Sequence, residues 1–382
     1  MSAAAKRCLN CFKENSEVPC HHCGWIPDSP TRPPFIPVGT VLNDCYQIGR
    51  VLGHGGFGIT YQGWDTNLDL PIAIKEYYPR KLATRVGSSL SLSVYTRQER
   101  NRFEDGLHDF QEEAKILAKF QGNPNIVGVY RFFHANNTCY MVMEYVSGVT
   151  LYAYLKHKGR LNYEMTFKVL SPVMKALKSV HEVGLLHRDV SPHNIYITKD
   201  NKVKLLDFGA ARSFNRIGDE EGLVIVKPGY APQEQYQARG NQGPWTDVYG
   251  LSATFYHCLT AEPPPVADER AEHDTLKPPS EYEGVDIPPA AEQALIKGLA
   301  VEVADRFQDI DSFRSALPKQ KNTVEKAAEA PVPAQTTAPK VEQPVPKQPA
   351  LKQPVPKNNL TKVIIGAVLL AALVLVFLTV YQ

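Results

Sequence analysis

The chain has 382 residues and a formal net charge of +2, and charged residues make up 21% of its composition. This length allows one large domain or two modest ones with tails, and the near-neutral charge gives no electrostatic reason to expect a nucleic-acid partner. The seven cysteines are not arranged as a disulfide framework, because four gather near the N-terminus and three are isolated. That distribution is typical of a reducing cytosol and one metal site. The first residues lack the apolar run of a signal peptide.

The first predicted element is a small cysteine module with a proline-rich connector, residues 1–37. Two C-x-x-C pairs, Cys8/Cys11 and Cys20/Cys23, are separated by eight residues. Each pair can point two thiolates at one ion, and four thiolates complete a tetrahedral zinc shell, so we expect the adjacent histidines to face solvent. A segment this short would draw its folding energy from the metal. We predict a short zinc ribbon with structural Zn²⁺; the alternative is a chance cluster of unpaired thiols.

A glycine-rich turn between two strands comes next. The segment 46–52 alternates like a strand and runs into GHGGFG at 53–58, and a return strand begins at 61–63. A G-x-G-x-x-G pattern alone is weak evidence, since it also opens helices in dinucleotide-binding folds. Strand residues on both sides favour a hairpin whose backbone N–H groups approach phosphates, because glycine has no Cβ atom to clash. The segment 73–75 then predicts a third strand, which ends at Lys75.

The most informative element is the octet HRDVSPHN at 187–194, followed by DFG at 207–209. Phosphoryl transfer needs this set of groups. Asp189 can receive the proton of an attacking hydroxyl, while Asn194 and Asp207 hold Mg²⁺ on the phosphates of ATP. The octet and the DFG motif therefore predict three catalytic residues: Asp189, Asn194 and Asp207.

Together these motifs resemble those of bacterial, eukaryotic-like (Hanks-type) Ser/Thr protein kinases over residues 40–317. The resemblance implies an α+β, bilobal protein-kinase fold, with ATP between a small β-rich lobe and a larger helical lobe. It also implies that Lys75 binds the α- and β-phosphates and pairs with a glutamate of the predicted helix 110–117. We choose Glu113 for this pairing, with Glu112 as the alternative.

The long connection between Lys75 and Glu113 is predicted to form a hairpin on the small lobe. Beyond it, an apolar strand should end in a hinge that bonds adenine through its backbone, with a methionine as gatekeeper. The complete set of residues expected to bind the nucleotide is Gly53, Gly55, Gly56, Gly58, Ala73, Lys75, Glu113, Met143, Glu144 and Val146.

One pair of positions departs from the family pattern. Ser191 stands where most Ser/Thr kinases have a lysine that neutralises the γ-phosphate, and Lys227 stands where a threonine is expected, three residues before Tyr230. We hypothesise that Lys227 restores the missing charge from the opposite side and acts in catalysis. The alternative is an inactive site, which would make the chain an ATP-binding pseudokinase scaffold. Because the loop lysine is missing at position 191, the sequence also does not determine whether the substrate hydroxyl belongs to Ser/Thr or to Tyr.

Other residues are predicted to organise the large lobe. Asp247 should order the backbone of the catalytic loop, and Glu234 should form a buried ion pair with Arg306. Both features favour a protein kinase over a small-molecule phosphotransferase, which can share the catalytic motif. We further hypothesise that an acidic residue at 219–221 neutralises Arg188 permanently, so that loop phosphorylation is not needed; a solvated acidic loop is the alternative.

The amino-acid composition changes after residue 317. Residues 318–359 are rich in lysine, proline, glutamine and alanine, which predicts a disordered linker. The segment 361–381 contains an uncharged apolar stretch just long enough for one transmembrane helix; a buried core helix is the alternative. Lysines precede it, so the positive-inside rule places residues 40–317 in the cytoplasm.

The sequence therefore predicts a protein kinase anchored in the inner (plasma) membrane by a single pass, acting in cytoplasmic signalling. It would transfer the γ-phosphate of Mg-ATP to Ser/Thr hydroxyls of protein substrates, with no nucleic-acid partner. Whether it forms a homodimer is left open.

Overall fold

The computed structural model describes five stretches of the chain: 7–86, 89–208, 212–213, 226–237 and 240–318. They lie in one compact unit, Met1–Lys321. The predicted linker beyond 318, the predicted transmembrane segment 361–381 and the acidic segment 219–221 lie outside the described residues. Within the described stretches, no helix is both long and apolar enough to cross a membrane.

The small lobe is a six-stranded sheet with strand order β1-β2-β3-β4-β8-β7, in which every neighbouring pair is antiparallel. Its central strands bury Ile48, Tyr61 and Ile74 completely, as expected for β-branched and aromatic residues inside a sheet. The strands are β1 (Val41–Leu42), β2 (Tyr46–His54), β3 (Gly58–Asp65), β4 (Leu70–Tyr77), β7 (Val129–Ala135) and β8 (Thr138–Glu144).

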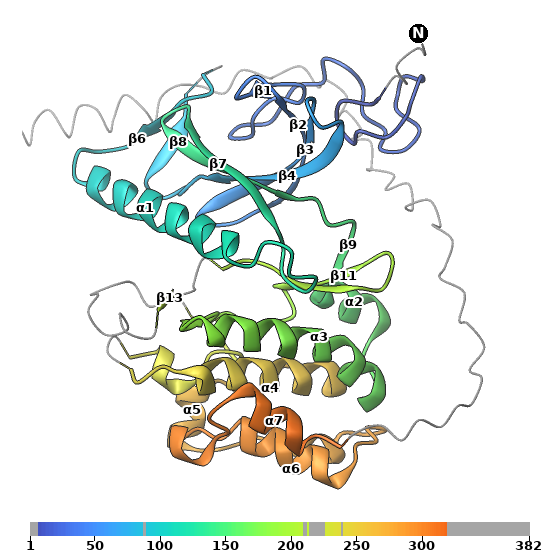
Figure 1. Cartoon of the computed structure of the whole chain (residues 1–382), viewed down its shortest axis with the longest axis vertical. Helices are drawn as coiled ribbons and strands as arrows, with labels where there is room; N and C mark the ends of the chain where they lie inside the picture. The colour runs from blue at the N-terminus through green and yellow to red at the C-terminus, as the bar shows by residue number, and fades with distance from the viewer. Residues whose placement is uncertain (1–6, 87–88, 209–211, 214–225, 238–239, 319–382) are drawn as a thin grey trace, which may run out of the picture. The chain divides into compact units, whose positions relative to one another are not determined.

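One long helix, α1 (Glu99–Ala118), packs against this sheet beside β7 and β8 (Figure 1). Its buried apolar residues Phe103, Phe110, Ala114 and Leu117 recur at the spacing of one helix face. The same face carries the buried Glu113. The helix predicted around 110–117 is therefore present and begins earlier than the apolar pattern indicated.

The connection between β4 and α1 contains a hairpin of β5 (Ala83–Arg85) and β6 (Leu92–Val94), as predicted. Its anchor is Glu76, which is completely buried and forms an ion pair with Arg85. The same carboxylate accepts hydrogen bonds from the hydroxyls of Tyr61 at 3.1 Å and Tyr140 at 2.9 Å. A buried charge needs such partners to offset its lost hydration, so this network ties the hairpin to the sheet.

The large lobe is built around α3 (Tyr163–Glu182) and α4 (Pro244–Thr260), which contact each other (Figure 1). Asn162 caps α3 by accepting a hydrogen bond from Met165. The other helices are α2 (Leu151–Lys158), α5 (Ala267–Glu272), α6 (Pro289–Gly298) and α7 (Ile310–Ala316), with short 3-10 helices η2 (Gln233–Gln235), η3 (Pro279–Glu281) and η4 (Val303–Asp305). The short strands are β9 (Gly148–Thr150), β10 (Leu185–Leu186), β11 (Ile195–Thr198), β12 (Val203–Leu205) and β13 (Arg212–Ser213). The predicted bilobal α+β architecture is confirmed.

Candidate active site

Lys75 of β4 contacts two carboxylates that come from different parts of the fold. Its Nζ atom lies 2.8 Å from Oε1 of Glu113 in α1, and 3.1 Å from Oδ1 of Asp207, just after β12. The structure therefore brings Lys75 to the glutamate chosen from the sequence. The alternative, Glu112, binds Lys115 at 2.7 Å on the exposed side of α1.

Burial and charge act in opposite directions on this pair. Burial raises the pKa of Glu113 to about 7, although the nearby ammonium of Lys75 acts against this rise. Burial alone would lower the pKa of Lys75, but the carboxylates of Asp207 and Glu113 hold that pKa above its ordinary value. Lys75 is therefore a cation at neutral pH. It lies beside an Asp207 side chain that is 49% exposed and so accessible to a ligand.

The glycine-rich turn joins β2 to β3 and is open on its outer side. A Cβ atom added at Gly53, Gly55 or Gly56 would meet no atom within 4 Å, whereas one at Gly58 would lie 2.8 Å from the carbonyl oxygen of Glu76. Among these four positions, protein packing thus requires glycine only at Gly58. The open space at the other three leaves the backbone accessible to a ligand.

The predicted hinge follows β8. Ala73 of β4 pairs with Met143 of β8, and Met143 and Val146 are partly buried against the hydrophobic core. The Glu144 carboxylate accepts a hydrogen bond from Nζ of Lys204 in β12 at 2.9 Å. Sequence reasoning missed Lys204, because a contact between residues 60 positions apart leaves no local pattern.

The catalytic loop is held by Asp247, as predicted from the sequence. This buried α4 carboxylate accepts hydrogen bonds from the backbone N–H groups of His187 at 2.8 Å and Arg188 at 2.7 Å, and contacts Nε2 of His181 at 2.7 Å. Burial alone would raise the pKa of Asp247, but these hydrogen bonds and the neighbouring imidazoles hold it below its ordinary value. An ionised Asp247 therefore fixes the loop backbone, including the left-handed φ of 67° at Arg188.

Asp189 and Asn194 lie side by side in this loop. The Nδ2 group of Asn194 donates to the carbonyl of Asp189 at 2.9 Å and to its Oδ2 atom at 2.8 Å. This leaves the amide oxygen of Asn194 as the atom that can bind a cation. The Asp189 side chain is 32% exposed, so a hydroxyl group can reach it.

The two exchanged positions are in contact. Nζ of Lys227 lies 2.8 Å from Oγ of the buried Ser191 and 3.1 Å from Oδ1 of Asp189. The carbonyl of Lys227 accepts the N–H groups of Tyr230 and Ala231, each at 3.0 Å, which fixes the turn that carries it. A cation therefore stands beside the predicted base.

The predicted ion pair between Glu234 and Arg306 is confirmed. Nη1 of Arg306 lies 2.8 Å from Oε1 of Glu234, and both side chains are buried. The hydroxyl of Thr246 donates to the same carboxylate at 2.9 Å. Nearby, Nε2 of Gln235 donates to the carbonyl of Arg188 at 2.9 Å. This second contact, which the sequence did not reveal, joins the segment after Lys227 to the catalytic loop.

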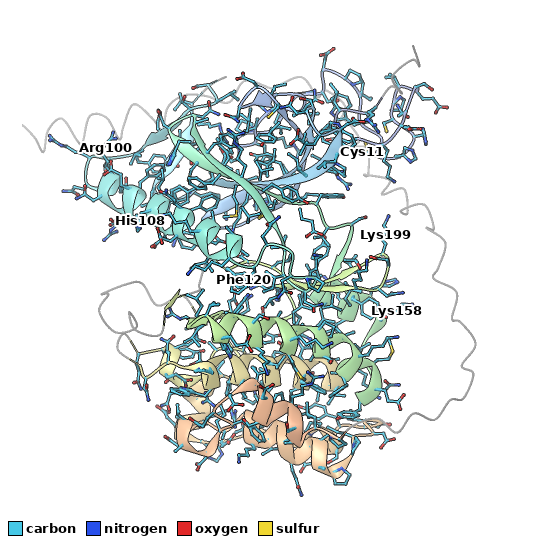
Figure 2. The ribbon with its side chains drawn as sticks, viewed as in Figure 1. Cys11, Arg100, His108, Phe120, Lys158 and Lys199 are labelled. Atoms are coloured by element: carbon cyan, nitrogen blue, oxygen red, sulfur yellow. The ribbon has the colours of Figure 1, made fainter. Side chains whose placement is uncertain are left out.

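A second candidate site lies in the N-terminal module. The sulfur atoms of Cys8, Cys11, Cys20 and Cys23 all lie within 4.8 Å of one another, and the adjacent histidines are exposed, as predicted. Figure 2 labels Cys11 near the strands of the small lobe. A cluster of four thiols suits a structural zinc ion, so the module is compatible with a zinc ribbon.

The comparison with protein families agrees with this geometry. The family model of the protein kinase domain matches residues 46–280. The chain belongs to the protein kinase family. Its kinase domain therefore contains the Lys75, Asp189 and Asp207 constellation in the context expected from the sequence.

Two curated relatives and one solved structure give the scale of the similarity. PknB, a serine/threonine-protein kinase of Mycobacterium tuberculosis, is 31% identical over 296 residues, which cover 74% of this chain and 44% of PknB. A Clostridium acetobutylicum protein named "Probable serine/threonine-protein kinase" is 29% identical over 292 residues, covering 75% of this chain and 41% of that protein. The chain thus matches less than half the length of each. The structure "PpkA-294 apo form" has 35% identity and a TM-score of 0.66, covering 74% of this chain and 99% of that one.

Proposed function

We propose that this chain is a serine/threonine-protein kinase that transfers the γ-phosphate of Mg-ATP to hydroxyl groups of protein substrates. The observation that carries the proposal is the position of Lys75, held between Glu113 and Asp207. A second group, Asp189 with Asn194, supplies a base next to an amide oxygen. The named function of the relatives supports the same activity.

In this proposal the small lobe binds the nucleotide. The open backbone at Gly53, Gly55 and Gly56 approaches the phosphates, and Lys75 contributes the positive charge. The backbone near Glu144 and Val146 bonds the adenine edge. When bound through Asn194 and Asp207, Mg²⁺ would neutralise phosphate charge.

On the acceptor side, Asp189 orients the substrate hydroxyl and takes its proton. Asn194 keeps the carboxylate in place through two hydrogen bonds. Lys227 supplies a cation beside this carboxylate, where it stabilises the charge on the transferring phosphoryl group. Ser191 positions the ammonium through its hydroxyl. These roles preserve transition-state stabilisation without a lysine in the catalytic loop.

Transfer of labelled γ-phosphate tests this function. The full chain would be offered Mg-ATP and a generic protein substrate, next to the Asp189→Asn variant. We expect incorporation that disappears in the variant, with phosphoserine or phosphothreonine as the product. Binding of Mg-ATP with no transfer would instead favour the pseudokinase scaffold, for which the serine at position 191 is the supporting observation.

We also propose that 361–381 anchors the kinase in the inner (plasma) membrane, with residues 40–317 in the cytoplasm. The apolar composition of this segment and the lysines before it support the proposal. Cell fractionation tests it: the full chain should stay with membranes after alkaline carbonate washing, and a chain lacking 361–381 should not. Equal release of both chains would refute the anchor.

A further inference from the structure

The N-terminal cysteine module has a core made mainly of its four clustered cysteines. The sulfur atoms of Cys8 and Cys23 are 3.7 Å apart, and those of Cys11 and Cys20 are 3.9 Å apart. A tetrahedral zinc shell with Zn–S bonds of about 2.3 Å has sulfur–sulfur edges of about 3.8 Å. Besides these cysteines, Trp25 packs against the cluster. So small a core depends on its metal for a fixed shape.

This module binds directly to the glycine-rich hairpin. The carbonyl of Asn10, inside the first cysteine pair, accepts the N–H of Arg50 in β2 at 2.9 Å. The carbonyl of Cys11 accepts a hydrogen bond from Nε2 of Gln62 in β3 at 3.2 Å. Gln62 in turn accepts from Nε of Arg50 at 2.8 Å. One loop of the cysteine module, at Asn10 and Cys11, therefore holds both strands of the hairpin.

The contact occurs where the hairpin's own ladder is irregular. The pairing of β2 with β3 shifts between Ile48 and Val51, and again between Val51 and Gly53. Arg50 lies between the shifted pairs, so the module provides a partner for its N–H group at a point where the strand register is interrupted. Arg50 lies only a few residues before Gly53, where the glycine-rich turn begins.

The module also approaches the strand too closely for any side chain. A Cβ atom added at Gly49 of β2 would lie 2.5 Å from the ring of Phe12 and 2.8 Å from the carbonyl oxygen of Asn10. On the metal side, Nδ2 of Asn10 lies 3.5 Å from Sγ of Cys23. Asn10 thus joins a metal ligand to β2 through its side chain and its backbone.

We propose that a zinc ion bound by the four cysteines acts as a clamp on β2 and β3, so that metal occupancy sets the order of the glycine-rich hairpin and the affinity for Mg-ATP. The nucleotide part of this inference depends on the proposed kinase function, whereas the clamp does not. The metal acts at a distance from the phosphates, through Asn10, Cys11 and the two strands that they hold.

The test uses the full chain and three variants. Cys20→Ser with Cys23→Ser removes the metal site, and Gln62→Leu removes one docking bond while leaving all four ligands. Lys13→Ala changes an exposed side chain of the same module and is the matched control. Three quantities are measured: zinc content, amide hydrogen exchange across 46–65, and the dissociation constant of a non-hydrolysable Mg-ATP analogue.

The wild type should contain one zinc ion per chain. The double cysteine variant should lose it, exchange faster across 46–65 but not in α4, and bind the analogue at least about fivefold more weakly, the lower end of usual coupling between sites. Gln62→Leu should keep its zinc and still exchange faster, and Lys13→Ala should match the wild type.

Two outcomes would overturn the clamp: a wild type without zinc, or hairpin exchange that is unchanged when zinc is lost. Unchanged affinity despite faster exchange would overturn the link from the clamp to nucleotide binding. If the double variant does not fold, chelation of the wild type and Gln62→Leu give the same comparison. A wild type that holds zinc but binds no nucleotide would refute the kinase function, while hydrogen exchange would still decide whether zinc clamps the hairpin.

Discussion

The two lysines of the site are held in different ways. Lys75 projects from a central strand and pairs with Glu113, whose side chain is 5% exposed. Lys227 stands on a turn beside Asp189, and both side chains are about one-third exposed, at 31% and 32%. The first charge is therefore built into the core of the small lobe, whereas the second depends on how one loop is folded. If the proposed roles hold, nucleotide binding and phosphoryl transfer therefore rely on two cations that different parts of the fold support.

The largest effect is expected for Lys75→Met. This change removes the cation that we propose binds the phosphates and leaves the buried Glu113 without its lysine, so transfer should fall by about 10²- to 10³-fold. Nucleotide affinity should fall as well, because the lost group contacts the ground state. Steady-state rates and direct binding measure the two effects, and Lys81→Met, at an exposed lysine, is the control. A variant with normal affinity would show that Lys75 does not bind the phosphates.

Lys227→Ala should have a smaller effect, which is confined to turnover. We expect kcat to fall by about 10²-fold, with little change in the KM for ATP, because this cation acts on the transferring group. Lys202→Ala, at an exposed surface pair with Asp200, should change neither quantity.

The exchange of residue types between positions 191 and 227 is tested by returning the lysine to position 191. The double variant Ser191→Lys with Lys227→Thr should recover most of the lost turnover, whereas Lys227→Thr alone should not. Near-normal rates in both Lys227→Ala and Lys227→Thr would contradict a catalytic role for this lysine.

The smallest expected effect is a pH dependence of nucleotide affinity and of stability, which arises from Glu113 in its pair with Lys75. Because burial raises the pKa of Glu113 to about 7, acidification below that value should protonate the carboxylate and weaken nucleotide affinity. One titrating group limits the change to tenfold per pH unit. The pH dependence of folding stability has the opposite sign to that of nucleotide affinity. The folded state holds this proton more tightly than the unfolded chain does, so stability should fall as the pH rises from the unfolded value, about 4.5, towards 7.

Binding and thermal unfolding, measured across this pH range in the wild type and in Glu113→Gln, check both slopes. The variant has no carboxyl group to titrate at this position, so both pH dependences should flatten. If the slopes are the same in the variant, another group is responsible for them.

Much of the site was predictable because its chemistry sits in short motifs. The spacing from Asp189 to Asn194 and Asp207 is fixed by one loop and one hairpin, and the resemblance to protein kinases favoured Glu113 over Glu112. The contact between Ser191 and Lys227 was also expected, since both residue types were out of place at positions that face each other. Each of these inferences used residues whose local sequence carries the signal.

The unpredicted contacts join residues that are far apart in sequence. The buried network of Glu76 and Arg85, the pairing of Glu144 with Lys204, and the bonds of Asn10 to β2 have no local pattern. For the network of Glu76 and Arg85, the sequence offered one sign: a glutamate at position 76 within an apolar strand. This network arises because burial removes water from the Glu76 carboxylate, which must then be paired by whichever segment the fold brings near it.

The amino-acid sequence alone indicated the chemistry of this protein: a phosphoryl-transfer motif set, a four-cysteine cluster and an unusual placement of one lysine. Side-chain types at fixed short spacings are enough for that, because they determine which atoms can act. Only the tertiary structure revealed that Glu76 pairs with Arg85, that Glu144 pairs with Lys204, and that the cysteine module rests on the glycine-rich hairpin. These depend on packing between distant segments, which no single stretch of sequence contains.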